Sequence, residues 1–344
     1  MAIKKIGIVS LSLGILGETF VKHELELGLS RLEDMGIEVV FLPNALKGVD
    51  DLDIHPEKRA QDLLDAYKDN SIDMILCAIG GDDTYRLLPY LFDDNQLKKV
   101  VTDKPFLGFS DTTINHLMLN KLGIKSFYGQ AFLPDICELS PNMLPYTEKY
   151  FKELIETGHI SKIEPSQVWY SERTDFSEKA LGTTTESFQN QGFQLLTGSS
   201  QFEGEILGGC LESLYDLFDN SRYADTVSLC QKYQLFPSLE EWRGKILLLE
   251  TSEEKPDRHL FEKMIGVLKD FGIFDVISGL LIGKPQDEAH DQEYKEILLA
   301  QLGHMNLPIV TNINIGHATP RCIIPFGVAT KVDVDKQVIT FDWS

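Results

Sequence analysis

The chain has few of the features that place a protein in a membrane or on a nucleic acid. None of its apolar runs approaches the roughly 18–20 residues that a membrane-spanning helix needs. Basic residues are in the minority, because 32 Lys and Arg stand against 53 Asp and Glu, a formal net charge of −21. Nucleic acids and anionic membrane surfaces attract basic patches, so neither is expected as a partner.

Motifs for metals and nucleotide cofactors are also missing. The five cysteines are scattered and form no CxxC pair, which is typical of a reducing compartment and disfavours a structural zinc site. The eight histidines show no HxxxH or HExxH spacing, and the chain has neither a GxGxxG after its first strand nor a Walker A motif. Serines and glycines interrupt the apolar stretch Ile6–Leu16, which favours a buried strand over a signal peptide. We therefore predict a cytoplasmic protein that uses neither a metal nor a cofactor.

The chain is long enough, and has enough apolar residues, to form the hydrophobic cores of two domains. The chain has 344 residues, of which 43% are hydrophobic. Strand-like and helix-like segments alternate, which predicts an α/β fold: an N-terminal, mostly parallel sheet flanked by helices (Rossmann/flavodoxin-like) and a C-terminal α/β domain with a mixed sheet. The expected boundaries are 1–138, 139–200 for a connection and substrate-covering loop, and 201–344. Ligands bind at the carboxyl ends of such strands, so the active site is expected in the interdomain cleft.

Two stretches carry more specific expectations about local structure. The alternation fades between Leu139 and Ser200, which predicts a connection and a long irregular loop. Such a loop is either a lid whose aromatic residues pack on a ligand or a segment whose aromatic residues only anchor it to the core. The stretch Gly208–Leu214 is expected to open a helix.

The segment Lys104–Thr113 is the first candidate for chemistry. It is predicted to be a short buried strand that turns directly into a helix, with Ser110 in the turn. A serine there lies beside the unpaired N–H groups of the helix, as in the nucleophile elbow of acyl-transfer enzymes. The alternative is that Ser110 or Asp111 only caps the helix.

Two other residues follow buried strands and complete a possible catalytic set. Glu250 ends the apolar strand 245–249, and His317 follows a glycine just after the strand 308–311. A serine hydroxyl needs a base, normally a histidine that a carboxylate orients, and Ser110, His317 and Glu250 meet these needs. Glu250 could instead be a solvated residue at a strand end, and His317 a core histidine satisfied by the backbone.

Seven motifs occur along the chain in the order known for one family. They are Ile79–Thr84, Leu87–Tyr90, Gly108–Thr113, Phe127–Gly129, Gly208–Cys210, Leu249–Glu253, and Gly316–His317 together with Pro325–Gly327. Over nearly the whole chain, this set resembles the serine LD-carboxypeptidases, and more closely their microcin C self-immunity (MccF-like) branch.

The resemblance implies a role for each candidate. Ser110 would be the nucleophile, His317 the general base and Glu250 its orienting carboxylate. The backbone N–H groups of Gly81 and Asp111 would form the oxyanion hole. The resemblance also implies two α/β domains with the site in their cleft and a homodimer.

The branch of the family decides the expected substrate. LD-carboxypeptidases remove the terminal D-alanine from murein tetrapeptides, whereas MccF-like enzymes cleave the amide that joins an amino acid to a nucleotide-like group. The Gly-Gly-Asp-Asp, Leu-Leu-Pro-Tyr and Glu-Thr-Ser-Glu-Glu patterns favour a peptidyl or aminoacyl nucleotide. Trp169, Phe188 and Phe193 are then candidates to pack on the base, and Phe193 stands where many members have tryptophan. The alternative of another class is a non-catalytic protein that only binds its ligand in the cleft.

Overall fold

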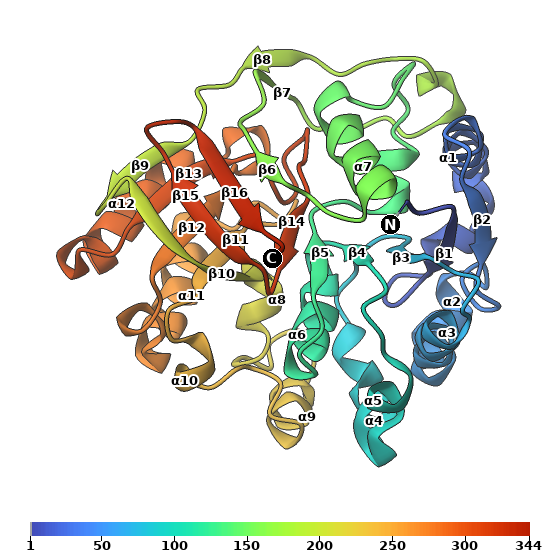
Figure 1. The fold of residues 1–344 in the computed structure, drawn as a ribbon, viewed down its shortest axis with the longest axis horizontal. Helices are drawn as coiled ribbons and strands as arrows, with labels where there is room; N and C mark the ends of the chain where they lie inside the picture. The colour runs from blue at the N-terminus through green and yellow to red at the C-terminus, as the bar shows by residue number, and fades with distance from the viewer. Residues whose placement is uncertain (1) are drawn as a thin grey trace.

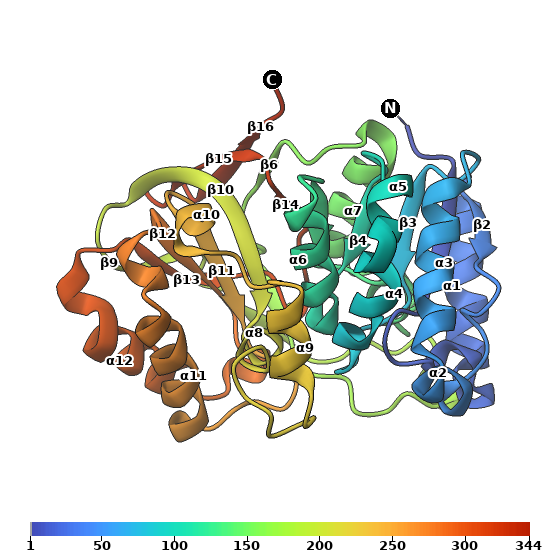
Figure 2. The same cartoon turned by 90° about the horizontal axis from the view of Figure 1, so that it is seen from below.

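The computed structural model describes residues 2–344, which form two large β-sheets side by side, each with its own helices, and a separate two-stranded sheet. In Figure 1 the N-terminal half runs from blue to green, and the C-terminal half from yellow to red lies next to it. Figure 2, seen from below, shows the two halves in contact along β10 (Gln201–Cys210), α6 (Thr113–Lys121) and α8 (Leu211–Tyr215). The two-domain α/β fold expected from the sequence is confirmed.

The first sheet has six strands in the order β14-β5-β4-β3-β1-β2, and all neighbours except β14 and β5 are parallel. The strands are β1 (Lys5–Val9), β2 (Glu38–Phe41), β3 (Met74–Cys77), β4 (Phe106–Gly108), β5 (Ser126–Tyr128) and β14 (Ile324–Phe326). The helices of this half are α1 (Lys22–Asp34), α2 (Val49–Ile54), α3 (Pro56–Lys68), α4 (Leu88–Phe92), α5 (Gln96–Val100), α6 (Thr113–Lys121) and α7 (Pro145–Thr157). Because helices cover both faces of the sheet, with α1 and α7 on one and α3 to α6 on the other (Figure 1), β3 and β4 are buried throughout and apolar.

The second sheet is mixed, as predicted, with the order β6-β16-β15-β10-β11-β12-β13-β9. Its centre, β10 to β13, is parallel, and the strands on either side pair antiparallel. The strands are β6 (Lys162–Ile163), β9 (Gln194–Thr197), β10 (Gln201–Cys210), β11 (Ile246–Glu250), β12 (Gly279–Gly283), β13 (Ile309–Ile313), β15 (Ala329–Asp333) and β16 (Val338–Asp342). The helices are α8 (Leu211–Tyr215), α9 (Thr226–Lys232), α10 (Leu239–Trp242), α11 (Arg258–Phe271) and α12 (Asp291–Leu302).

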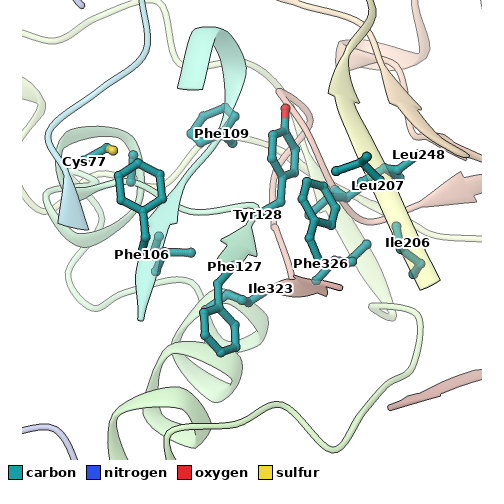
Figure 3. Packing of buried hydrophobic residues seen from close by; sticks show 14 of the residues in the cluster. Cys77, Phe106, Phe109, Phe127, Tyr128, Ile206, Leu207, Leu248, Ile323 and Phe326 are labelled. Carbon is teal, nitrogen blue, oxygen red and sulfur yellow. The ribbon is translucent and has the colours of Figure 1, made fainter. Parts of the chain in front are cut away.

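Strand β14 connects the two halves. It comes late in the chain, yet it pairs antiparallel with β5 of the first sheet. The rings of Tyr128 on β5 and Phe326 on β14 stack with their centroids 5.4 Å apart. Figure 3 shows this pair beside Ile206 and Leu207 of β10, all within one buried apolar cluster. This shared core holds the ends of β4 and β11 in a defined relative position, which matters for the residues that follow each strand.

The segment between residues 139 and 200 is more regular than the sequence predicts. It contains helix α7, whose buried Tyr150, Phe151 and Leu154 lie on one face, between Pro145 at the first turn and Gly158 at the C-cap. It also contributes β6 and β9 to the second sheet, and β7 (Val168–Tyr170) pairs with β8 (Ser187–Gln189). The longest irregular stretch lies between β7 and β8 and contains one short 3-10 helix, Glu178–Ala180.

The expected helix start at Gly208 is wrong, because Gly208 and Gly209 belong to strand β10 and helix α8 begins at Leu211. Gly209 is needed for close packing rather than for a turn. A Cβ there would lie 2.3 Å from the Thr113 hydroxyl oxygen, which accepts the Cys210 N–H at 2.9 Å. The glycine thus lets the second sheet touch the first turn of α6.

No helix within residues 2–344 combines the length and the apolar character that crossing a bilayer would require. All five cysteines are buried and unpaired.

A buried ion pair supports the loop after β3. The Arg59 guanidinium on α3 is fully buried and donates to the Asp83 carboxylate at 2.5 and 2.9 Å. Breaking a buried pair by removing one partner leaves an uncompensated charge and destabilises by about 3–5 kcal/mol. Because Arg86 also pairs with Asp83, at 2.9 Å, we expect Arg59→Met to lower the free energy of unfolding in urea by an amount at the lower end of that range. Lys58→Met, which removes a partly exposed amine paired with Asp51, is the matched control, and an equal loss in both variants would contradict the prediction.

Candidate active site

Ser110 lies at a strained corner between β4 and a short 3-10 turn (Ser110–Thr112) that leads into α6. Its φ is +64°, a conformation that non-glycine residues rarely adopt and that is characteristic of a nucleophile elbow. No side chain caps the start of the turn or of α6. The Ser110 Oγ lies instead 3.1 Å from Nε2 of His317. The alternative that Ser110 serves only as a helix cap is therefore wrong.

Glu250 and His317 meet Ser110 from the second domain. Glu250 is the last residue of β11 and is 1% exposed, so it is not a solvated strand end. Its Oε2 lies 2.8 Å from Nδ1 of His317. A carboxylate at this distance accepts a hydrogen bond from Nδ1–H and leaves Nε2 facing Ser110, the arrangement that an acyl-transfer base needs. His317 is therefore bound by carboxylate and hydroxyl rather than by backbone alone.

The loop that carries His317 approaches Glu250 closely because residue 316 is glycine. Gly316 has φ +90°, and a Cβ there would lie 2.4 Å from Glu250 Oε2. Arg321 anchors the same loop, since its guanidinium donates to the carbonyls of Gly316 and, at 2.9 Å, His317. Arg321 is itself held by Asp135 at 2.8 Å. The position of the imidazole is thus set by the backbone on one side and a buried ion pair on the other.

Gly81 and Asp111, the two predicted oxyanion donors, lie on neighbouring loops beside Ser110. Gly81 has φ +151°, and a Cβ there would be 2.1 Å from Ser12 Oγ, so only glycine fits. The Asp111 carboxyl is buried, which raises its pKa, and it accepts the Thr84 N–H at 2.9 Å. The carboxyl therefore fastens the glycine loop to the elbow, and the Asp111 N–H lies in the first turn, where backbone donors have no intrahelical acceptor.

Two polar contacts of the site were not expected from the sequence. The Tyr128 hydroxyl accepts the Ser110 N–H at 3.1 Å and donates to Glu250 Oε1 at 2.6 Å, and burial together with the Glu250 charge raises the pKa of Tyr128 well above its usual value. Glu253 Oε2 lies 3.0 Å from His317 Nε2. The Phe127–Gly129 motif could have indicated that Tyr128 belongs to the site. No spacing in the sequence, however, indicates that the Glu253 side chain points toward His317.

The carboxylates dominate the electrostatics of His317. Burial alone lowers the pKa of this imidazole, but the charges and hydrogen bonds of Glu250 and Glu253 outweigh it and raise the pKa to about 10. Reciprocally, the hydrogen bond to His317 lowers the pKa of Glu253 to about 2. Both carboxylates therefore favour the protonated form of the imidazole.

Two cavities open on Ser110. The larger, about 470 Å³, also reaches His317 and is walled mainly by apolar side chains that include Phe20 and Phe176. The smaller, about 240 Å³, is lined by acidic residues and Arg222. Ser110 and Glu253 belong to the walls of both. Across residues 2–344, no three His, Cys, Asp or Glu side chains are grouped as ligands for a metal ion.

The three aromatic residues predicted to contact substrate do not line either of these cavities. Trp169 stacks on Phe188 with ring centroids 4.5 Å apart, and the Lys284 amine lies 4.9 Å from the Trp169 ring. Phe193 is 4% exposed and belongs to the core. Three phenylalanines line the larger cavity: Phe109, which is 4% exposed, and Phe20 and Phe176, which are 62% and 54% exposed. Their apolar character gives no sequence signal that separates them from core residues.

The fold and the geometry define a two-domain α/β protein with a serine, a histidine and a glutamate gathered from both domains. The family model of the LD-carboxypeptidase N-terminal domain matches residues 6–129, and that of the C-terminal domain matches residues 203–332. The chain therefore belongs to the LD-carboxypeptidase family, peptidase family S66, whose members are hydrolases.

Individual relatives fall within the same family. The chain is 66% identical to an MccF-like protein from Streptococcus pneumoniae solved in complex with AMP, with a TM-score of 0.97 over 99% of both chains. It is 25% identical over 290 residues to the microcin C7 self-immunity protein MccF of Escherichia coli (83% of this chain, 78% of the relative). It is 24% identical over 326 residues to a probable murein peptide carboxypeptidase of Bacillus subtilis (93% and 87%).

Proposed function

We propose that the protein is a serine amidase that hydrolyses the amide bond joining an amino acid or peptide to a nucleotide-like group. The observation that carries the proposal is the continuous set of contacts Ser110–His317–Glu250, at 3.1 and 2.8 Å, in which Ser110 and His317 line a cavity. A cytoplasmic homodimer with domain boundaries near residues 138 and 201 stays a prediction.

The contacts support a two-step reaction. His317 Nε2 takes the Ser110 proton as Oγ attacks the substrate carbonyl carbon, and the N–H groups of Gly81 and Asp111 stabilise the resulting oxyanion. The same nitrogen then gives its proton to the leaving amine, and the C–N bond breaks. A water molecule, deprotonated by His317, hydrolyses the acyl-enzyme and restores Ser110. Glu250 holds the Nδ1 proton and stabilises the imidazolium throughout, and Tyr128 holds Glu250.

The nucleotide-like group is favoured by two observations. The related Streptococcus pneumoniae protein binds AMP in its structure and is similar over almost the whole chain. In this chain the lining of the larger cavity includes the exposed aromatic rings of Phe20 and Phe176. Aromatic faces suit a nucleobase, because every base has a π-face on which such a ring can stack.

The test is a direct comparison of two substrates. We expect the purified protein to release the amino acid and sulfamoyl adenosine from an aminoacyl-sulfamoyl adenosine, followed by liquid chromatography and mass spectrometry. The alternative, a murein tetrapeptide LD-carboxypeptidase, predicts release of D-alanine from the tetrapeptide instead. Turnover of the tetrapeptide alone would overturn the nucleotide proposal, and binding of either compound without turnover would favour the non-catalytic alternative.

Phe176 offers a finer test of the larger cavity. Because stacking on an aromatic ring contributes about 1–3 kcal/mol per base, Phe176→Ala should raise the KM for the adenosine conjugate by roughly 5- to 150-fold. The kcat should change little, since the ring does not touch the triad. Phe188→Ala is the matched control, because Phe188 is also exposed but does not line the cavity. A larger increase in KM for the control would point to the β7–β8 aromatic residues instead.

A further inference from the structure

His317 Nε2 has two competing partners. Ser110 Oγ lies 3.1 Å away and Glu253 Oε2 lies 3.0 Å away. To accept the serine proton, Nε2 must present a lone pair. A carboxylate has no proton to donate, so its contact with Nε2 requires that the nitrogen carry one. The Glu253 contact therefore belongs to an imidazolium that cannot act as the base.

Glu253 also occupies space that the reaction needs. The leaving nitrogen of the substrate must come within hydrogen-bond reach of Nε2 to receive its proton. An oxygen 3.0 Å from that nitrogen already fills this place. Because Glu253 and Ser110 line both cavities, the carboxylate lies at the junction where the scissile bond would be placed.

The Glu253 side chain is exposed enough to move, and a second cationic group, the Arg222 guanidinium, lies near it. It lies in the turn after β11, outside regular structure, and its side chain is 62% exposed. Arg222 lines the smaller cavity, where it pairs with Glu254 at 3.1 Å and Asp82 at 3.3 Å. The Arg222 charge also helps to lower the pKa of Glu253. A carboxylate that left His317 would therefore remain near a guanidinium.

We propose that Glu253 is a gate on the general base: in the empty enzyme it holds His317 protonated, and the substrate displaces it to free Nε2 for Ser110. This inference rests on the proposed function and adds a step before the chemistry. The other charged groups that face His317 are Glu250, which stays bound to Nδ1, and Arg321, which binds the main-chain carbonyl. Neither contacts Nε2, so among these charged groups only Glu253 can hold the Nε2 proton and then give up its place to the substrate.

The gate predicts a particular pH dependence. The base works only when deprotonated, so activity rises as pH increases through the pKa of His317. The profile of kcat/KM reports the free enzyme and that of kcat reports the substrate complex. The acid limb of kcat/KM should therefore lie at higher pH than the limb of kcat. In Glu253→Gln the two limbs should converge, because the amide removes the charge that favours imidazolium.

A fluorophosphonate probe tests the gate without any natural substrate. Ser110 attacks the phosphorus, fluoride leaves and the serine proton passes to His317, so the labelling rate follows the neutral imidazole. Since removal of one neighbouring charge typically lowers the pKa of its partner by about one unit or more, labelling of Glu253→Gln at pH 7 should be about tenfold faster than that of the wild type. Glu253→Ala should behave alike. Glu57→Gln, which removes an exposed carboxylate 2.7 Å from His55, is the control and should leave the rate unchanged.

The outcomes separate the two proposals. Faster labelling of both Glu253 variants, with the acid limb moved to lower pH, supports the gate. Labelling of Ser110 with the same pH profile in wild type and variants would overturn the gate and leave the serine amidase standing. If no form were labelled at any pH, the serine mechanism would fail and the gate with it. Circular dichroism of each variant establishes that the comparison is made on folded protein.

Discussion

Ser110→Ala is expected to abolish hydrolysis of the adenosine conjugate, with a loss in kcat of roughly 10⁴- to 10⁶-fold. The alanine has no oxygen to attack the carbonyl, while its backbone can keep the positive φ that serine adopts here. Substrate binding should persist, because the cavity walls and the N–H groups of Gly81 and Asp111 are unchanged. Single-turnover kinetics and isothermal titration calorimetry measure the two quantities separately.

A serine in another setting provides the control for this variant. Ser199→Ala removes an exposed hydroxyl between β9 and β10 and should leave kcat and KM unchanged. Retention of more than about a hundredth of wild-type kcat in Ser110→Ala would be inconsistent with a serine nucleophile. It would favour direct attack by water, with His317 as its base.

Glu250→Gln has the second largest expected effect, a loss in kcat of about 10⁴-fold. The amide has nearly the same shape as the carboxylate, so packing around β11 is retained. It can, however, donate toward Nδ1 and so place the imidazole proton on Nε2, where it blocks proton transfer from Ser110. It also removes the charge that stabilises the imidazolium formed during attack. The measurement is kcat at saturating substrate, with thermal unfolding to show that the fold remains.

The Tyr128→Phe variant separates the effect of the Glu250 charge from the effect of the hydrogen bonds that hold Glu250 in place. Phenylalanine removes the hydroxyl that joins the Ser110 N–H to Glu250 but leaves the carboxylate beside His317. We expect a loss of about 10- to 100-fold in kcat, because the triad loses one hydrogen bond that holds its geometry rather than a reacting group. If Tyr128→Phe were as inactive as Glu250→Gln, the tyrosine would have a direct chemical role.

The sequence predicts regular elements well where apolar spacing and end signals agree. The buried strand before Glu250, predicted over 245–249, runs from Ile246 to Glu250 and so lies within one residue of its prediction. It fails where neighbouring signals conflict. Tyr150, Phe151 and Leu154 have helical spacing, yet the polar run that follows them hides α7 among residues expected to be irregular. The stretch Gly208–Leu214 similarly predicts a helix start, although Gly208 packs closely on β11 and Gly209 on α6, and both lie in a strand.

The substrate-facing residues were the least predictable part of the site. Whether an aromatic side chain lines a cavity or fills the core depends on what surrounds it in space, and its local sequence carries no such information. Phe193 lies in the core and Phe176 reaches the larger cavity, although both come from the same segment. The contact of Glu253 with His317 likewise depends on how the turn after β11 is oriented.

By itself, the sequence determined the α/β architecture, the elbow around Ser110 and the identity of three residues suited to acyl transfer, because strand periodicity, turn residues and motif order are local properties. Only the tertiary structure decided that Glu250 and His317 meet Ser110, that β14 joins the first sheet, and that Glu253 competes for Nε2. These are contacts between residues up to 207 positions apart along the chain. They form because the two sheets pack through one shared apolar core, and no local pattern encodes that packing.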